Sequence, residues 1–282
     1  MLSSLALDAS SGEDRHARNG ERMAGTGEVV AAARGDAESD VRLRLLDGFE
    51  LRQNGARVEL PLAAQRLLAF LALHNRPMTR LYVAGALWID ASEERSRANL
   101  RATLWRLRKP GAPLVEASST HVRLGSEVVV DVASLVSSAQ EMLRGHDRDG
   151  DLEDACLGGD LLPDWYDEWV LEERERLRQL RVHALEALAE RLAARERFGQ
   201  AIEAALAAVR AEPLRESSER VLIKVHLAEG NHGEALRRYL GYRRRLRDAL
   251  GIEPSRQMTE LVAELTRRAR RERVGDGSVT PA

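Results

Sequence analysis

The feature that most constrains the fold of this chain is a pattern in its second half that recurs every 34 residues. Leu188, Leu192, Gly199, Ala201, Ala205 and Ala208 recur, 34 positions on, as Leu222, His226, Gly233, Ala235, Tyr239 and Tyr242. This is the tetratricopeptide period, in which each repeat is one helix–turn–helix unit. Pro213 and Pro254 lie at the ends of these units. This agrees with a helical repeat, because proline ends a helix.

Two such repeats are too few to bury their own apolar faces. The preceding segment from Trp165 to Leu188 is also helical in pattern, and we expect it to cover the open end of the array. The helical pattern starts at about Ser134. We therefore predict an all-α tetratricopeptide-like domain over residues 133–268 and a disordered C-terminal tail over residues 269–282.

The first half of the chain is organised differently. Residues 1–40 are rich in small and charged residues without a sustained period, which predicts a disordered tail. From Val41 to Leu60, short alternating runs flank Asn54-Gly55, a pair typical of a tight hairpin turn. Two amphipathic helices are expected next, over Gln65–His74 and from the N-cap Thr79 to Trp88.

A third, basic helix is expected from Arg95 to Lys109, where Pro110-Gly111 ends it. Its apolar stripe is Leu100, Leu104 and Leu107. The opposite face combines two alanines with residues that match base edges and phosphates. This outward face holds Arg95, Ala98, Asn99, Ala102, Trp105, Arg106 and Lys109.

Strand-like segments follow the basic helix. Leu114–Ala117 and Val122–Leu124 flank the turn Ser118–Thr120, and Val128–Val132 continues as a strand. Strands, three helices with the third basic, and a hairpin are the element order of a winged helix-turn-helix, which we expect over residues 41–132. The fold class predicted for the whole chain is mainly α with a small α+β domain.

Charge is distributed unevenly along the chain. The formal net charge is −2, but residues 41–125 hold fourteen basic and seven acidic residues. Such asymmetry indicates nucleic acid as the partner of the basic part. Cys156 is the only cysteine, so a reducing compartment, the cytoplasm, is expected. No apolar run approaches the length of a membrane span.

Several short motifs in the right order resemble the Streptomyces antibiotic regulatory protein family, an OmpR-type winged helix followed by a bacterial transcriptional activation domain. They are Asn99-Leu100-Arg101, Arg106-Leu107-Arg108, Leu162-Pro163-Asp164-Trp165, Trp169, Glu173-Arg174, Pro213-Leu214-Arg215-Glu216, Glu234-Ala235-Leu236-Arg237-Arg238-Tyr239 and Leu250-Gly251-Ile252-Glu253-Pro254. One departure is that the wing has His121-Val122 in place of a glycine–aromatic pair.

The resemblance implies a cytoplasmic transcriptional activator that binds direct repeats in promoters, as a homodimer, and recruits RNA polymerase holoenzyme, often for secondary-metabolite genes. It implies DNA contacts at Asn99, Arg101, Arg106 and Arg108. It also implies a polymerase-facing loop made of Ile89, Asp90, Ala91, Ser92 and Glu93.

The basic helix and the wing add candidate contacts of their own. These are Arg95, Arg97, Ala102 and Lys109 on the helix, with His121 and Arg123 on the wing, although His121 also fits an ordinary surface residue. We expect Arg108 to reach a phosphate and Arg101 to contact either a base or a phosphate. Trp105 could stack on the duplex or contact a sugar, but packing against a neighbouring element is the favoured interpretation.

No enzymatic site is expected. The two lysines, Lys109 and Lys224, do not follow a glycine-rich phosphate loop. Asp147, Asp149 and Asp151 begin like a calcium loop, but the glycine and glutamate that such a loop requires are missing, so Gly145–Gly159 is interpreted as a linker. No cofactor or metal is predicted. The alternative to a DNA-binding activator is a protein-binding adaptor whose winged helix serves protein contact.

Overall fold

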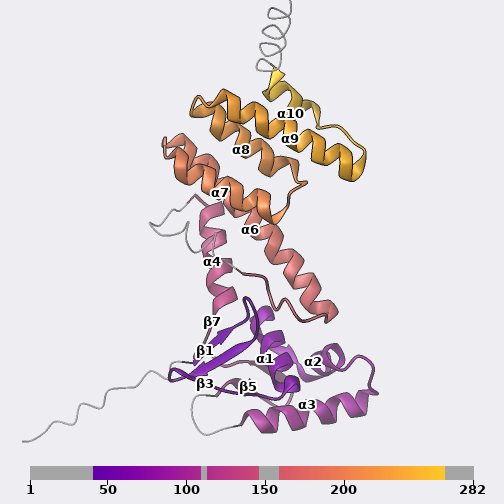
Figure 1. The fold of residues 1–282 in the computed structure, drawn as a ribbon. Helices are drawn as coiled ribbons and strands as arrows, with labels where there is room; N and C mark the ends of the chain where they lie inside the picture. The colour runs from indigo at the N-terminus through magenta and orange to yellow at the C-terminus, as the bar shows by residue number, and fades with distance from the viewer. Residues whose placement is uncertain (1–40, 109–112, 146–158, 264–282) are drawn as a thin grey trace, which may run out of the picture. The chain divides into compact units, whose positions relative to one another are not determined.

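A computed structural model describes residues 41–108, 113–145 and 159–263 of the 282-residue chain (Figure 1). The N-terminal tail, Lys109, Pro110-Gly111, most of the linker and the C-terminal tail lie outside the described residues. The described part begins with two small sheets and three helices, and it continues with helices only. This is the predicted class, mainly α with a small α+β domain.

The first sheet has the strand order β3-β2-β1-β7. Its strands are β1 (Val41–Arg44), β2 (Glu50–Gln53), β3 (Ala56–Arg57) and β7 (Val128–Val130). β1 pairs antiparallel with β2 and parallel with β7. The hairpin predicted at Asn54-Gly55 is confirmed, since both residues take positive φ, 50° and 78°, between β2 and β3.

The second sheet has the order β4-β6-β5 and forms the wing. Its strands are β4 (Met78–Thr79), β5 (Val115–Ala117) and β6 (His121–Leu124). The two-residue β4 was not predicted from the sequence. It pairs antiparallel with β6, so the segment that leads into the second helix is tied to the wing.

Three helices complete the winged domain: α1 (Leu62–His74), α2 (Arg80–Leu87) and α3 (Glu93–Leu107). The predicted N-cap of α2 is confirmed, because the Thr79 hydroxyl accepts a hydrogen bond from the Tyr82 amide. The third helix is shorter than predicted at its C-terminal end. Arg108 is its C-cap with φ −77° and ψ 75°, outside the helix.

The chain then becomes helical. The helices are α4 (Asp131–Leu143), α6 (Glu168–Ala194), α7 (Phe198–Ala211), α8 (Glu216–Ala228), α9 (His232–Leu250) and α10 (Arg256–Leu261). The strand expected over Val128–Val132 is therefore too long: β7 ends at Val130 and α4 begins at Asp131. The Asp131 carboxylate accepts hydrogen bonds from the Leu45 and Leu46 amides, which fixes this change of direction.

The 34-residue pattern marks the seams of the helical part. α6 packs on α7, α7 on α8, and α8 on α9. All repeat positions except the two glycines are buried, from Leu188 and Ala201 in the first repeat to Leu222 and Ala235 in the second. Tyr242 is 1% exposed and donates a hydrogen bond to the Leu214 carbonyl at 3.3 Å, and burial raises its pKa to about 12.

Candidate nucleic-acid interface

The basic helix α3 is held by an apolar seam. Leu100, Leu104 and Leu107 are 2%, 7% and 6% exposed, as the sequence predicts. Glu93 and Glu94 lie in the first turn, where negative charge favours the helix dipole. The three buried leucines keep one side of α3 against the winged core, so the other side of the helix faces outward.

That outward side is cationic. Arg95, Arg101, Arg106 and Arg108 are exposed, and among the described residues none of them forms an ion pair or a side-chain hydrogen bond. Arg97 is different, because it lies 2.6 Å from Glu93 in an ion pair one helical turn apart. The guanidinium groups of three arginines of α3 and of its C-cap Arg108 therefore remain available to an anion. Lys109, also predicted for this face, lies outside the described residues.

The other two predicted residues of this helix differ in exposure. Ala102 is exposed, whereas Asn99 is half-buried at the flank of the face. The Asn99 carbonyl also accepts a hydrogen bond from the Thr103 hydroxyl at 2.9 Å.

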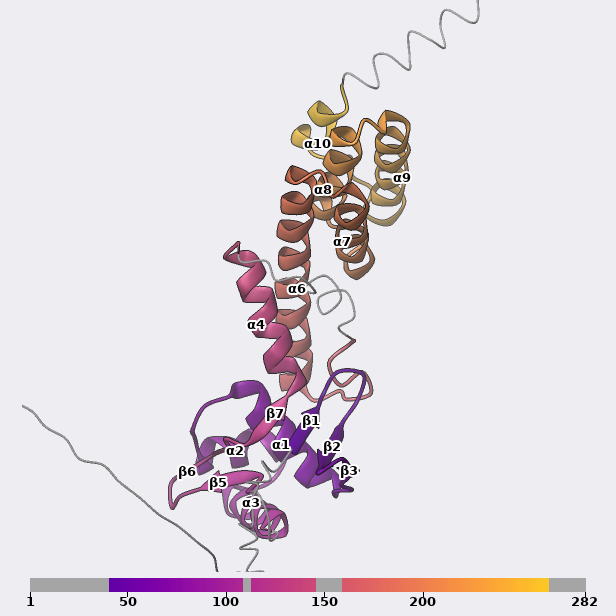
Figure 2. The same ribbon diagram turned by 90° about the vertical axis from the view of Figure 1, so that its left-hand side faces the viewer.

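A hollow lies between α3, the start of α2 and the tip of the wing. It is lined by Thr79, Arg80, Leu81, Arg97, Leu100, Arg101, Ser119 and Thr120. Figure 2 shows β5 and β6 beside α3, with α2 behind them. Three guanidinium groups and three hydroxyl groups gather here, a donor set that suits a phosphate.

Arg80 was not among the residues predicted for this surface. Its Nε donates to the Ser118 carbonyl at 2.9 Å, and its backbone amide donates to the Thr120 carbonyl at 2.9 Å. It therefore holds the wing turn beside α2 while its side chain lines the hollow. Its position directly after the N-cap Thr79 was a signal available in the sequence.

The wing places its two predicted residues in different environments. The Arg123 guanidinium donates to Glu116 Oε2 at 2.8 Å and 2.5 Å, and this holds the pKa of the Glu116 carboxyl below its ordinary value. His121 is exposed, and its Nδ1 lies 2.9 Å from the Thr120 hydroxyl. Arg123 is thus neutralised by a neighbour, whereas His121 has an open surface position.

The loop between α2 and α3 is organised by Ser96, which is 3% exposed. Its hydroxyl lies 3.1 Å from the Trp88 carbonyl, 3.0 Å from the Ser92 carbonyl and 3.4 Å from the Ala91 carbonyl. The loop therefore has a fixed path. Ile89, in this loop, is 76% exposed.

The favoured interpretation of Trp105 is wrong. Packing against a neighbouring element predicts a buried ring, but the Trp105 side chain is 75% exposed on the outward side of α3. The reason is geometric: Trp105 lies nearly opposite the leucine seam, and no helix or strand of the described residues covers that side.

The tryptophan motif before α6 lies at the junction with the winged domain. Trp165 stacks on Phe49 with ring centroids 6.1 Å apart, and Trp169 meets Phe70 edge-on at 5.2 Å. The winged core also includes Leu161, Leu162, Val170 and Leu177. The first part of α6 thus belongs to one core and its last part to the core of the repeats.

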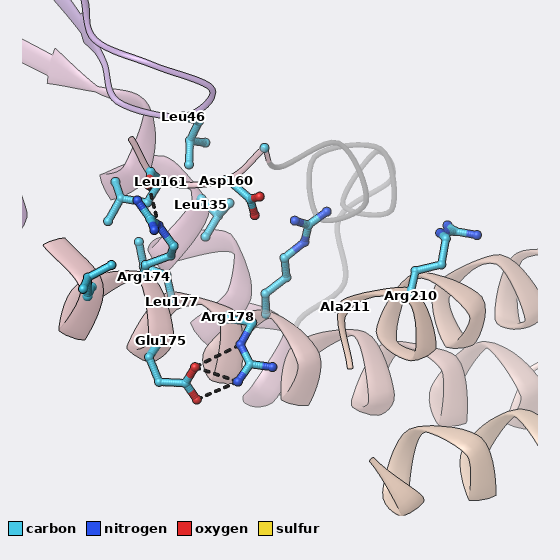
Figure 3. Close-up of a pocket in the computed structure, with 13 residues that line it drawn as sticks. Leu46, Leu135, Asp160, Leu161, Arg174, Glu175, Leu177, Arg178, Arg210 and Ala211 are labelled. Atoms are coloured by element: carbon cyan, nitrogen blue, oxygen red, sulfur yellow. Dashed lines mark hydrogen bonds and ion pairs between the residues drawn. The ribbon is translucent and has the colours of Figure 1, made fainter. Parts of the chain in front are cut away.

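A second hollow lies at this junction, between Leu46, α4, the segment 159–161, α6 and the end of α7 (Figure 3). Two of its arginines have structural partners. Arg174 donates to the carbonyls of Leu161, Leu162 and Trp165, and Arg178 donates to Glu175. We interpret this hollow as a braced junction between elements.

Two titratable side chains of the repeats, Glu219 and His226, are buried. Glu219 is 0% exposed and accepts from Arg245, yet its Oε2 has no partner among the described residues, and burial raises its pKa. His226 is 7% exposed, and burial lowers its pKa.

No group of three potential metal ligands occurs in the residues searched, 41–108, 113–145 and 159–263. Within the same ranges, no helix is both long enough and apolar enough for a bilayer span.

Comparison with known proteins identifies the helical part. Residues 133–266 match the family described as the bacterial transcriptional activator domain. The Trp165 and Trp169 junction and both 34-residue repeats fall inside this domain.

Two relatives extend the likeness to the winged part. The chain is 29% identical over 210 residues to the regulatory protein AfsR of Streptomyces coelicolor, covering 69% of this chain and 21% of AfsR. The structure of Mycobacterium tuberculosis EmbR in complex with a low-affinity phosphopeptide superposes with a TM-score of 0.66 at 23% identity, over 82% of this chain and 66% of EmbR. The chain thus spans less than two thirds of each relative. The resemblance to the Streptomyces antibiotic regulatory proteins, and the fold it implies, are confirmed.

Proposed function

We propose that this protein is a cytoplasmic DNA-binding transcriptional activator in which α3 enters the major groove. The observation that carries the proposal is the outward face of α3, where Arg95, Arg101, Arg106 and Arg108 are exposed and unpaired among the described residues. Exposed unpaired cations on a helix backed by an apolar seam suit the phosphates and guanine edges of a duplex. The presence of a bacterial transcriptional activator domain supports the same function.

The wing hollow supplies a second contact region in this proposal. Arg80 and Arg101 lie on two sides of the hollow, and Ser119 and Thr120 close it at the wing tip. A backbone phosphate seated there would fix the register of α3 without reading sequence. Arg97 also lines this hollow, although its guanidinium group forms an ion pair with Glu93. We assign His121 to the adjacent backbone and give Arg123 a lesser role because Glu116 holds it.

The loop from Ile89 to Glu93 is the proposed contact for RNA polymerase. Ser96 fixes the path of this loop, so Ile89 and Asp90 are presented outward in one arrangement. The family resemblance supports this assignment, and it also supports binding to direct repeats as a homodimer, in promoters of secondary-metabolite genes.

The test of DNA binding uses the full chain and a random duplex pool. Bound sequences are selected and footprinted, and we expect two protected repeats about one helical turn apart. A single protected half-site would contradict the dimer and leave DNA binding intact. Absence of binding even in dilute buffer would overturn the proposed function and favour the protein-binding adaptor.

Point variants assign the contacts. Arg101→Ala or Arg106→Ala should weaken binding by about 1–3 kcal/mol and relax preference at one position if the residue reads a base. A loss that is equal for all sequences, with a salt slope lower by about 0.9, would assign a phosphate contact. Arg244→Ala is the matched control, because Arg244 is an exposed arginine on α9. Equal effects of all three variants would contradict an interface on α3.

A further inference from the structure

Trp105 is the exposed aromatic side chain of α3, with 75% of its surface accessible. Tryptophan commonly buries 150–250 Å² of surface, roughly, when it is packed. Leaving such a ring in water therefore forgoes a large apolar contribution. The only apolar residues on the same side of α3 are two small alanines, Ala98 and Ala102, which cannot bury an indole ring, so packing within the helix does not explain its position.

The position of Trp105 on the helix is informative. At about 100° per residue, Ala98, Ala102 and Trp105 fall within an arc of about 60°, centred opposite the leucine seam. All three are exposed. The middle of the outward face is therefore an apolar strip.

Arginines border this strip on both sides. Arg95 and Arg106 project from one flank and Arg101 from the other. Arg108, the C-cap, is exposed just beyond the end of the helix. An apolar protein partner that covered the strip would also remove these four guanidinium groups from water. The free-energy cost would be high, because a charge buried without a partner loses its hydration. A partner with an apolar centre and two anionic borders has no such cost.

Duplex DNA has this arrangement in its major groove. The groove is about 12 Å wide, which accommodates a helix of about 10–12 Å diameter. Its two edges are phosphate backbones, and the thymine C5-methyl is the apolar group on its floor. The two alanines allow close approach, and the larger indole reaches further toward the bases.

We propose that Trp105 recognises thymine by packing its indole ring against the C5-methyl group. This inference rests on the proposed function, since it requires α3 to lie in the groove. It adds a residue that determines specificity by apolar contact, beside arginines that act through charge. The predicted consequence is a thymine preference at the position that Trp105 faces.

The test removes the methyl group from the DNA and the indole from the protein. Full-length wild-type chain is titrated with its selected site, in which each thymine is replaced in turn by deoxyuridine. We expect one or two positions at which the replacement weakens binding about fourfold, the factor that corresponds to one buried methyl group. Trp105→Ala should bind thymine and deoxyuridine equally at those positions, whereas Trp105→Phe should retain most of the difference.

A matched control and a spectroscopic readout accompany the titration. Tyr166→Ala removes an aromatic side chain that is 81% exposed outside α3, and it should keep the full thymine–deoxyuridine difference. Acrylamide should quench the wild-type fluorescence less when DNA is bound, and Trp105→Phe should lose this protection. Because Trp105 is exposed, its variants should keep the wild-type circular dichroism and melting temperature.

Three outcomes overturn the proposal. One is that no thymine position responds to loss of the methyl group in the wild type. Another is that Trp105→Ala keeps the same response as the wild type. The third is that the wild-type chain binds no duplex, which also overturns the proposed function, whereas the first two leave that function standing.

Discussion

Arg66 on α1 forms an ion pair with Asp167, the residue that immediately precedes α6. The pair joins the winged domain to the N-terminal end of α6. Its side chains are 26% and 22% exposed, and Arg66 Nε is buried without a partner among the described residues. The contact reinforces the neighbouring packing of Trp169 on Phe70.

Breaking this pair should destabilise the chain measurably. We expect Arg66→Ala to lower the free energy of unfolding by about 1–2 kcal/mol, below the ~3–5 kcal/mol of a fully buried pair because both groups keep some water contact. Urea unfolding measures the loss, and a double-mutant cycle with Asp167→Ala isolates the pairwise part. Arg176→Ala, in the exposed pair with Glu173, is the control and should cost little. Additive effects of the two Arg66 and Asp167 variants would contradict a direct interaction.

The Glu116–Arg123 pair gives a prediction about the wing. Hydrogen bonds from Arg123 lower the pKa of Glu116 below its ordinary value of 4.5. The carboxyl is therefore charged at neutral pH, and the ion pair persists there. Glu116→Gln should free Arg123 for a phosphate, tighten DNA binding and steepen the log–log salt slope by up to about 0.9. Glu127→Gln changes the same charge at a nearby exposed site. If both variants tighten binding equally, the effect is one of net charge and Arg123 makes no contact.

Ser96 should matter for the loop between α2 and α3. Ser96→Ala removes a buried hydroxyl that lies within hydrogen-bond distance of three loop carbonyls, and we expect a loss of about 1 kcal/mol in unfolding free energy. Hydrogen exchange of the Ala91 amide, which donates to the Trp88 carbonyl, should accelerate. Ser137→Ala on the exposed side of α4 is the control. Unchanged exchange at Ala91 would show that the loop holds its path without Ser96.

His226 gives the repeats a pH-dependent stability. Burial lowers its pKa, against an opposing effect of Glu234 and Glu229 and with a reinforcing effect of Arg238. The folded state therefore binds fewer protons, so stability is present above the ordinary value of 6.5 and is lost as pH falls below it. The slope from this group reaches at most about 1.4 kcal/mol per pH unit.

The matched substitution is His226→Leu, because Leu192 holds the same position one repeat earlier. It should remove this part of the pH dependence and stabilise the chain at pH 7 by about 1 kcal/mol, since His226 Nδ1 is buried without a partner among the described residues. Urea titrations from pH 5 to 7.5 measure both effects. His232→Leu changes an exposed histidine and is the control. The assignment is wrong if His226→Leu keeps the wild-type slope.

Periodicity predicted the repeats and the seam of α3 because both depend on local spacing of apolar residues. The parts that it missed depend on contacts distant in sequence. β4 has two residues and exists because β6 pairs with it, and Asp131 starts α4 by binding amides 85 and 86 residues away. Trp105 shows the same limit: helical spacing gives its direction, but only the packed structure shows that the part of the chain it describes leaves that side uncovered.

The unbroken course of α6 from Glu168 to Ala194 has a mechanical consequence. Its N-terminal residues pack into the core of the winged domain. Its C-terminal residues pack against α7 and α8. A continuous helix has no joint along its length, so bending it would require breaking consecutive backbone hydrogen bonds. A rotation of the winged domain about the axis of α6 is therefore transmitted along the helix to the repeats.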